Sequence, residues 1–173
     1  MAEIKKNKVA APTSPSTEGV ALDDPTAQVL SHFRLIFNSV KTHFQKVERK
    51  AGISGAQAWA LSIISTSEGL GVSALARAMH IHQSTASNLV KALIERELIV
   101  AAKDGPDKRT VQLHLLPAGR KVLKRVPGPF SGVLPQALAN LDPPTLQRLD
   151  TDLAQLIVVL GADERGAQIP LGE

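Results

Sequence analysis

Residues 72–115 contain two helical patterns that are separated by three residues and followed by a pattern of two short strands. Apolar residues recur every three or four positions over 72–79 and again over 83–96, which predicts two amphipathic helices joined by a tight turn. This order predicts a helix–turn–helix followed by a β-hairpin. It does not suit a parallel sheet, whose strands alternate with longer crossover connections. The expected buried residues are Leu75, Ala76 and Met79 on the first helix, and Ala86, Leu89, Val90, Leu93 and Ile94 on the second.

The second helix of this pair begins with small polar side chains. An α-helix fits the major groove of B-DNA, which is about 12 Å wide, and short hydroxyl and amide groups can bond base edges or phosphates there. Lys91 lies one turn further along and can reach a phosphate. The predicted DNA-contacting residues of this helix are Gln83, Ser84, Thr85, Ser87, Asn88 and Lys91.

The β-hairpin is predicted from an apolar run over 98–102 and an alternating segment over 110–115. The polar turn between them carries Asp107, Lys108 and Arg109. An arginine at a hairpin tip can enter the minor groove, where the potential is most negative. A carboxylate two residues earlier can hold its guanidinium in place, so these three residues are also predicted to contact DNA.

Basic charge is concentrated in the same part of the chain. The net charge is +4, but residues 72–125 carry 10 Lys/Arg against 4 Asp/Glu, a net +6. Residues 126–173 carry 2 against 6, a net −4. A polyanionic partner would be attracted to the first segment and repelled by the second.

Amphipathic helices flank the helix–turn–helix on both sides. Ser54 is the expected N-cap of the helix just before it, and Pro127-Gly128-Pro129 must break or sharply kink the helix that follows the hairpin. No run of about 18 apolar residues is present, so no membrane span is expected. The flanking helices are predicted at about 25–50, 55–66, 117–126, 130–140 and 143–161.

Residues 72–123 resemble the DNA-binding region of the MarR-type transcription regulators. The resemblance continues upstream to Trp59 and, more loosely, covers about 25–161. The combined pattern of two helices, a charged hairpin and the next helix start is more specific than any single piece. The matching pieces are Leu75-Ala76, QSTAS at 83–87, ALIERELI at 92–99, Asp107-x-Arg109, Leu113-x-Leu115 and Pro117-x-Gly119.

The resemblance implies a mainly α-helical fold with a small β-hairpin wing, assembled as a two-fold symmetric homodimer. It implies that two winged regions bind a pseudo-palindromic operator on double-stranded DNA. The serines, threonine and asparagine of the second helix would approach bases or phosphates, and Arg109 would be a wing arginine held by Asp107. The protein is expected to regulate transcription, as a repressor that covers a promoter.

The expected organisation is a single domain between two tails. The N-terminal tail is rich in Lys, Pro, Ser and Thr and is expected to be disordered. The expected ranges are the N-terminal tail 1–22, the MarR-like domain 23–161 with its winged helix–turn–helix core at about 54–116 and its dimerisation helices at about 25–50 and 117–161, and a flexible C-terminal tail 162–173.

Three positions depart from the family pattern. His80 stands in the turn where glycine is usual, and His82 stands where a Ser or Asp N-cap is usual. Glu97 replaces the glycine that normally follows the second helix. If position 97 is left-handed, a residue with a Cβ there costs on the order of 1 kcal/mol.

The resemblance also implies a small-molecule pocket between the dimerisation helices and the DNA-binding lobe. Such pockets are mostly apolar with a few polar groups. Basic or imidazole contacts would favour a small aromatic acid or a phenolic compound as the effector. The predicted effector-binding residues are Phe37, His43, Phe44, Trp59, Ser62, Arg120 and Lys121.

Other classes of function are disfavoured. The chain has no cysteine, which excludes disulfides, thiol nucleophiles and thiol redox sensing. It has no catalytic triad signature, P-loop or dinucleotide fingerprint, and its five histidines show no metal-ligand spacing, so no enzyme activity, cofactor or metal is expected. Without a signal peptide, the expected location is the cytoplasm. Two alternatives remain: a winged domain used for protein–protein contact, and a constitutive DNA-binding protein without an effector.

Overall fold

The computed structural model describes residues 24–103 and 111–171. The chain divides into two compact units, residues 1–34 and 35–173. Of the first unit, the described part is Asp24 and the beginning of helix α1, in which Val29 and Leu30 are exposed. All other elements belong to the second unit.

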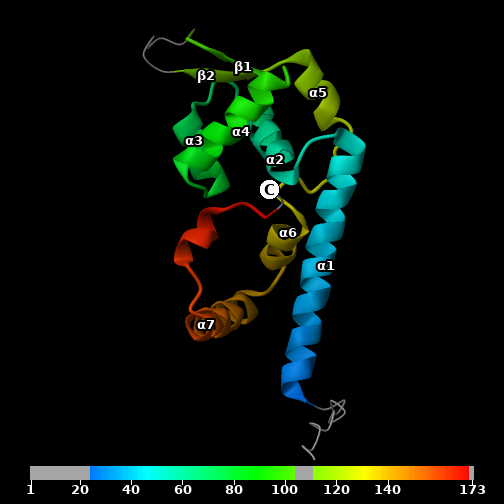
Figure 1. Cartoon of the computed structure of the whole chain (residues 1–173), viewed down its shortest axis with the longest axis vertical. Helices are drawn as coiled ribbons and strands as arrows, with labels where there is room; N and C mark the ends of the chain where they lie inside the picture. The colour runs from blue at the N-terminus through cyan, green and yellow to red at the C-terminus, as the bar shows by residue number, and fades with distance from the viewer. Residues whose placement is uncertain (1–23, 104–110, 172–173) are drawn as a thin grey trace, which may run out of the picture. The chain divides into compact units, whose positions relative to one another are not determined.

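The described elements follow the predicted order of helices and strands (Figure 1). The predicted fold class, mainly α-helical with a β-hairpin wing, is confirmed. No described helix is long and apolar enough to cross a membrane. The elements are α1 (Pro25–Ala51), α2 (Gly55–Thr66), α3 (Val72–Met79), α4 (Gln83–Glu95), β1 (Ile99–Ala102), β2 (Gln112–Leu115), α5 (Pro117–Leu123), α6 (Val133–Ala139), α7 (Pro143–Leu160) and the 3-10 helix η1 (Glu164–Gln168).

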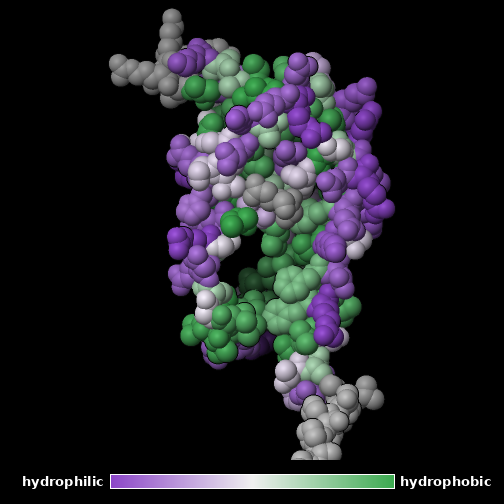
Figure 2. All heavy atoms as spheres, in the orientation of Figure 1, coloured by the Kyte–Doolittle hydropathy of each residue, from purple (hydrophilic) through white to green (hydrophobic). Residues whose placement is uncertain are grey.

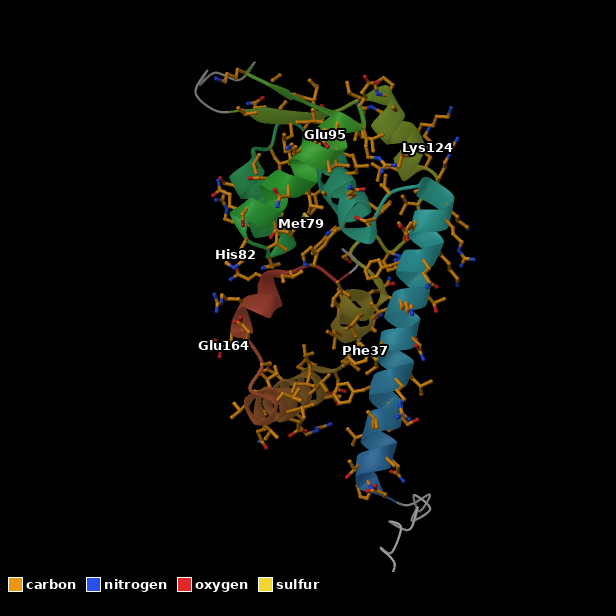
Figure 3. All side chains as sticks on the ribbon, in the orientation of Figure 1. Phe37, Met79, His82, Glu95, Lys124 and Glu164 are labelled. Atoms are coloured by element: carbon orange, nitrogen blue, oxygen red, sulfur yellow. The ribbon has the colours of Figure 1, made fainter. Side chains whose placement is uncertain are left out.

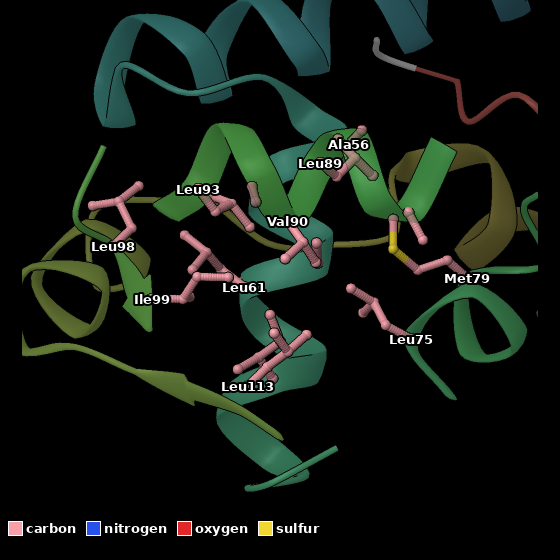
Figure 4. Packing of buried hydrophobic residues seen from close by; sticks show 14 of the residues in the cluster. Ala56, Leu61, Leu75, Met79, Leu89, Val90, Leu93, Leu98, Ile99 and Leu113 are labelled. Atoms are coloured by element: carbon pink, nitrogen blue, oxygen red, sulfur yellow. The ribbon is translucent and has the colours of Figure 1, made fainter. Parts of the chain in front are cut away.

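The hydrophobic core lies where α2, α3, α4 and the hairpin meet. Figure 4 shows Leu89, Val90 and Leu93 of α4 among the core residues that surround α2. The side chains of Leu61, Leu75, Leu93 and Leu113 are fully buried. The alanines of α2 at positions 56, 58 and 60 are all buried, and their small side chains let neighbouring elements approach the helix closely.

All but one of the predicted buried residues of α3 and α4 are buried. The exception is Ile94, which is 39% exposed, so its predicted burial is wrong. Ile94 follows Ala86 by eight residues, which at 3.6 residues per turn places it about 80° around the helix. It therefore lies beyond the edge of the buried stripe.

The turn between α3 and α4 is closed by a left-handed residue. His80 has φ 54°, and the Ile81 N–H donates to the carbonyl of Ala76 at 3.0 Å. Glu97 also is left-handed, with φ 55°, and the Leu98 N–H donates to the carbonyl of Leu93 at 3.0 Å. His80 and Glu97, two of the three positions that depart from the family pattern, thus adopt the backbone conformation that favours glycine, at a cost on the order of 1 kcal/mol each.

The hairpin is joined to the rest of the winged region by backbone hydrogen bonds. Its strands are antiparallel, with Ile99 opposite Leu115 and Ala102 opposite Gln112. The Leu113 N–H donates to the carbonyl of Leu70 at 3.0 Å, which ties β2 to the connection between α2 and α3. The hairpin tip, including Asp107, Lys108 and Arg109, lies outside the described residues, as does the predicted N-terminal tail.

Gly119 explains the Pro-x-Gly pattern after the hairpin. A Cβ at this position would lie 2.2 Å from the carbonyl oxygen of Leu98. The same oxygen accepts a hydrogen bond from the Leu116 N–H at 3.0 Å. Only glycine lets α5 begin this close to the chain that enters β1.

The helices after the hairpin are less buried than α2, α3 and α4 before it. As predicted, the Pro127-Gly128-Pro129 segment interrupts them, and α5 ends at Leu123, ten residues before the first residue of α6. Neither α6 nor α7 contains a buried residue. The predicted C-terminal tail contains η1, whose backbone is capped by Asp163.

Candidate nucleic-acid interface

Helix α4 has two sharply different faces. Its apolar stripe packs into the core, so the position and rotation of the helix are determined by burial. The opposite face is polar and open to solvent. Gln83, Ser84, Ser87, Asn88 and Lys91 are exposed, and Thr85 is half-buried.

The N-terminus of α4 has no side-chain cap. His82 occupies the N-cap position in an extended conformation and makes no capping hydrogen bond. In contrast, α2 begins with a reciprocal capping box between Ser54 and Gln57, with both hydrogen bonds at 3.2 Å. The first N–H groups of a helix have no acceptor inside the helix, and they carry the positive end of its dipole. The start of α4 therefore presents donors suited to an anionic group such as a phosphate.

Two side chains of the polar face are held by weak local contacts. The Ser87 hydroxyl donates to the carbonyl of Gln83 at 2.8 Å, which leaves its oxygen able to accept. The Lys91 Nζ lies 3.9 Å from a carboxylate oxygen of Glu95, and both side chains are largely exposed. An exposed ion pair of this kind contributes roughly 0–1 kcal/mol to the stability of the folded state. Lys91 can therefore exchange Glu95 for another anion at little cost.

Further cationic or titratable side chains lie beside the start of α4. Arg77 at the end of α3, His80 in the turn and His82 before α4 are all exposed. None of the three is among the residues that the sequence predicts for the interface. Helical spacing gave no signal for Arg77 and His80 as a pair, because His80 lies beyond the end of α3 in a left-handed conformation.

One basic residue near the interface has a structural role instead. The guanidinium of Arg96, which follows α4, donates a hydrogen bond to the backbone carbonyl of Gly52. This bond joins the end of α4 to the connection between α1 and α2. Arg96 therefore helps to orient α4.

The structure brings together only some of the predicted effector-binding residues. Phe37 and Phe44 line a groove of about 520 Å³ between α1 and the start of α2, together with Lys41 and Glu48. The ring of Phe44 lies so close to Gly55 that a Cβ there would be 2.1 Å from it. Trp59, Ser62, Arg120 and Lys121 are not part of this groove.

The remaining predicted effector residues are engaged elsewhere. Ser62 donates its hydroxyl hydrogen to the carbonyl of Trp59 at 2.7 Å, and Trp59 packs against the core. Arg120 lies 3.5 Å from the carboxylate of Glu68, and Lys121 is exposed on α5.

His43 lies on another face of α1. It lines a separate cavity of about 410 Å³ with Lys46 and Val133. Its side chain is buried, and its Nε2 has no hydrogen-bond partner. Its ring makes an edge-to-face contact with the ring of Phe44, with 5.4 Å between the ring centroids. Within the described residues, no three His, Asp or Glu side chains come together as a metal site.

Comparison with known proteins identifies the same segment. Residues 51–110 match the family model described as the MarR family. The chain is 35% identical over 48 residues to YsmB of Bacillus subtilis, an uncharacterised HTH-type transcriptional regulator. It is 38% identical over 66 residues to a protein proposed to regulate transcription of the hcr operon in Thauera aromatica. These alignments cover 28% and 38% of the chain, and 33% and 40% of the two relatives.

The fold also recurs among solved structures. The chain is similar to the Staphylococcus aureus MepR protein in its complex with DNA, with a TM-score of 0.53 and 22% identity. The match covers 76% of this chain and 97% of MepR. The family match covers α2, the helix–turn–helix of α3 and α4, and β1, and over residues 51–110 the chain is similar to the MarR family.

Proposed function

We propose that this chain is a DNA-binding transcription regulator that inserts α4 into the major groove of a duplex. One observation carries the proposal. The apolar stripe of α4 is buried against the core, while the whole opposite face and the uncapped N-terminus are polar and open. A helix held in this way can enter the groove without rearrangement of the core. The S. aureus MepR structure with the same fold contains DNA, which supports this proposal.

Within this proposal, the residues of α4 have different tasks. Ser84, Thr85, Ser87 and Asn88 read base edges, and Gln83 and Lys91 bind the backbone. Asp107, Lys108 and Arg109 of the wing act in the adjacent minor groove, as the sequence predicts.

Arg109→Ala should then weaken DNA binding by a few kcal/mol at most, because one minor-groove contact is lost. An affinity for DNA that is unchanged at matched salt concentration would remove the wing from this proposal.

Two substitutions on the exposed face of α4 test the proposal. Asn88→Ala should reduce the preference for the chain's own promoter over a scrambled duplex by about 1–3 kcal/mol, because a base contact is lost. Lys91→Ala should weaken binding to both duplexes and reduce the slope of log K against log salt by about one, because a phosphate contact is lost. Lys46→Ala, at an exposed lysine of α1, is the matched control and should change neither quantity.

The measurement is fluorescence anisotropy over a series of salt concentrations. Weak binding that is insensitive to salt, unchanged by either α4 substitution, would favour the alternative of a winged domain for protein–protein contact. Salt-dependent binding of promoter and scrambled duplex with equal affinity would contradict base reading by α4.

We further propose that two copies bind DNA together, and that the regulator is a repressor. The exposed apolar residues of α7 support the first statement, because a helix without a buried face requires a partner surface. In a symmetric dimer, two α4 helices about 34 Å apart would match successive major grooves of a pseudo-palindromic operator. Repression would follow from occupation of a promoter, and a reporter assay with the chain's own promoter tests it.

The groove at Phe37 and Phe44 supports a small aromatic acid or phenolic compound as the effector. It offers aromatic surface beside the ammonium group of Lys41. Thermal-shift screening with substituted benzoates and phenols should identify a stabilising compound, and Phe37→Ala should abolish that shift. Phe130→Ala, at another exposed ring that lies outside the groove, is the control. DNA release by salt but by none of these compounds would favour the alternative of a constitutive DNA-binding protein.

A further inference from the structure

The C-terminal segment after α7, defined here as residues 163–171, returns to the helix–turn–helix. It begins with η1, where the Asp163 carboxylate accepts hydrogen bonds from the backbone N–H of Arg165 at 3.0 Å and from its Nε at 3.1 Å. The only buried residue among the described residues after Gly132 lies in this segment, and it is Pro170. Its neighbours Ile169 and Leu171 are 57% and 56% exposed. The segment is therefore anchored at one point, whereas α6 and α7 before it bury no residue.

The anchored segment lies beside the turn between α3 and α4. Gln168 lines a cavity of about 640 Å³ together with Arg77, His80 and Gln83. Figure 3 shows η1, with Glu164 labelled, on the side of the winged region where His82 is labelled. The other residues that line this cavity are Ser73, Ala76 and Ile81.

This position overlaps the surface that the proposed function uses. Gln83 is at once a lining residue of this cavity and the first residue of the helix assigned to the major groove. Arg77 and His80 are positive or protonatable groups close to the uncapped end of α4. A duplex that approaches this end requires the space beside them, and the carboxylates of Asp163 and Glu164 would repel its phosphates.

We propose that the C-terminal segment covers one edge of the helix–turn–helix in the free protein, and that duplex DNA must displace it. The segment is an autoinhibitory contact, and the inference rests on the proposed function of α4. A single buried proline and one glutamine make a weak anchor, so the cover opens without unfolding of the winged region. Apparent affinity for DNA falls by the fraction of molecules in the open state, and a closed population of about four-fifths would weaken binding about five-fold.

Truncation after Ala162 tests the inference and leaves the end of α7 intact. Gly161 ends α7 in a left-handed conformation, and the Ala162 N–H donates to the carbonyl of Ile157 at 3.3 Å, so both are retained. The truncated protein should bind the promoter duplex about five-fold more tightly than the full chain at the same salt concentration. Pro170→Ser should also increase the affinity for the promoter duplex. Ile169→Ser, at the exposed neighbouring residue, should leave this affinity unchanged.

Hydrogen exchange provides a second readout that does not depend on affinity. Relative to the full-length parent, truncation or Pro170→Ser should accelerate amide hydrogen exchange in the peptide that contains residues 76–85, because the segment that covers this peptide has been removed or loosened. Addition of duplex DNA to the full chain should accelerate exchange over residues 164–171.

The outcomes separate the two proposals. Equal affinities of the truncated and full-length proteins, with unchanged exchange over 76–85, overturn the cover and leave the DNA-binding function standing. Failure of both proteins to bind any duplex at low salt overturns the proposed function, and the autoinhibitory contact with it.

Discussion

The winged region and the last long helix place their apolar side chains in opposite environments. From α2 to β2, the leucines and isoleucines other than Ile94 belong to one core, and several of them are completely buried. On α7 no residue is buried, and Val158, Val159 and Leu160 are 79%, 84% and 68% exposed. Figure 2 shows hydrophobic atoms gathered over the part of the surface that α7 occupies in Figure 1.

This difference indicates two kinds of stability within one chain. The winged region contains its own core, so its fold depends on contacts within a subunit. Helix α7 is amphipathic but faces no core of its own, and contiguous exposed apolar surface of this kind marks an interaction site. Because its pattern is the usual one for a helix packed on another helix, a second copy of the chain is the partner that we propose.

The largest expected effect comes from placing charges on the exposed end of α7. Val158→Asp combined with Val159→Asp should dissociate the proposed dimer and weaken operator binding about 100-fold or more, because binding through two linked sites is lost. Sedimentation velocity and anisotropy measure the two effects. The circular dichroism of the winged region should remain unchanged. A double variant that sediments as a dimer would show that α7 is not the interface.

Truncation of matched leucines tests whether the two regions differ in stability. Leu93→Ala in the core should lower the free energy of unfolding by about 2–5 kcal/mol, because it leaves a cavity among fully buried side chains. Leu160→Ala should lower the free energy of unfolding much less, provided that the chain is kept dilute enough to be a monomer. Urea unfolding measures both. Equal losses for the two variants would contradict the division proposed here.

Glycine at a left-handed position should stabilise the winged region without affecting association. Glu97→Gly should raise the free energy of unfolding by about 1 kcal/mol, because Glu97 has φ 55° and a Cβ is disfavoured there. Glu95→Gly, at a helical residue two positions earlier, is the control and should destabilise. A Glu97→Gly variant that is less stable than the parent would mean that the carboxylate of Glu97 has a role that its backbone does not explain.

The smallest effect concerns the start of α7. Hydrogen bonds from the side chain and the backbone N–H of Thr145 lower the pKa of Asp142 below its ordinary value of 3.8. The unfolded chain therefore binds this proton more readily than the folded one, so the stabilisation is present above pH 3.8 and is lost as the pH falls through the folded pKa. Asp142→Asn should melt slightly lower than the parent at pH 6, and the difference in melting temperature should shrink as the pH falls below 3.8 toward the folded pKa. A difference that stays constant as the pH falls through this range would contradict ionisation as its cause.

Much of the winged region was predictable because its signals are local. The periodicity of α3 and α4, the N-cap at Ser54 and the alternation of β2 each depend on a few neighbouring residues, and the structure confirms them. The polar face of α4 was predictable for the same reason, since a buried stripe on a helix determines what lies opposite it.

The residues predicted to bind an effector do not all line one groove, because they come from segments that are far apart in the chain. Phe37 and Phe44 line one groove, as residues two turns apart on one helix can. Whether Trp59, Arg120 or His43 faces the same cavity depends on how α1, α2 and α5 are rotated against one another. The sequence pattern of each helix does not contain that rotation.

The sequence by itself determined which segments become helices and strands and which face of each one is apolar, because those properties follow from backbone propensity and from the period of the side chains. Tertiary structure alone decided that the apolar face of α4 is covered while that of α7 is open. It also decided that Pro170, an unremarkable residue near the end of the chain, is buried while the more apolar Ile169 beside it is not. The physical reason is that burial depends on which surfaces meet in space, and residues distant in sequence supply those surfaces.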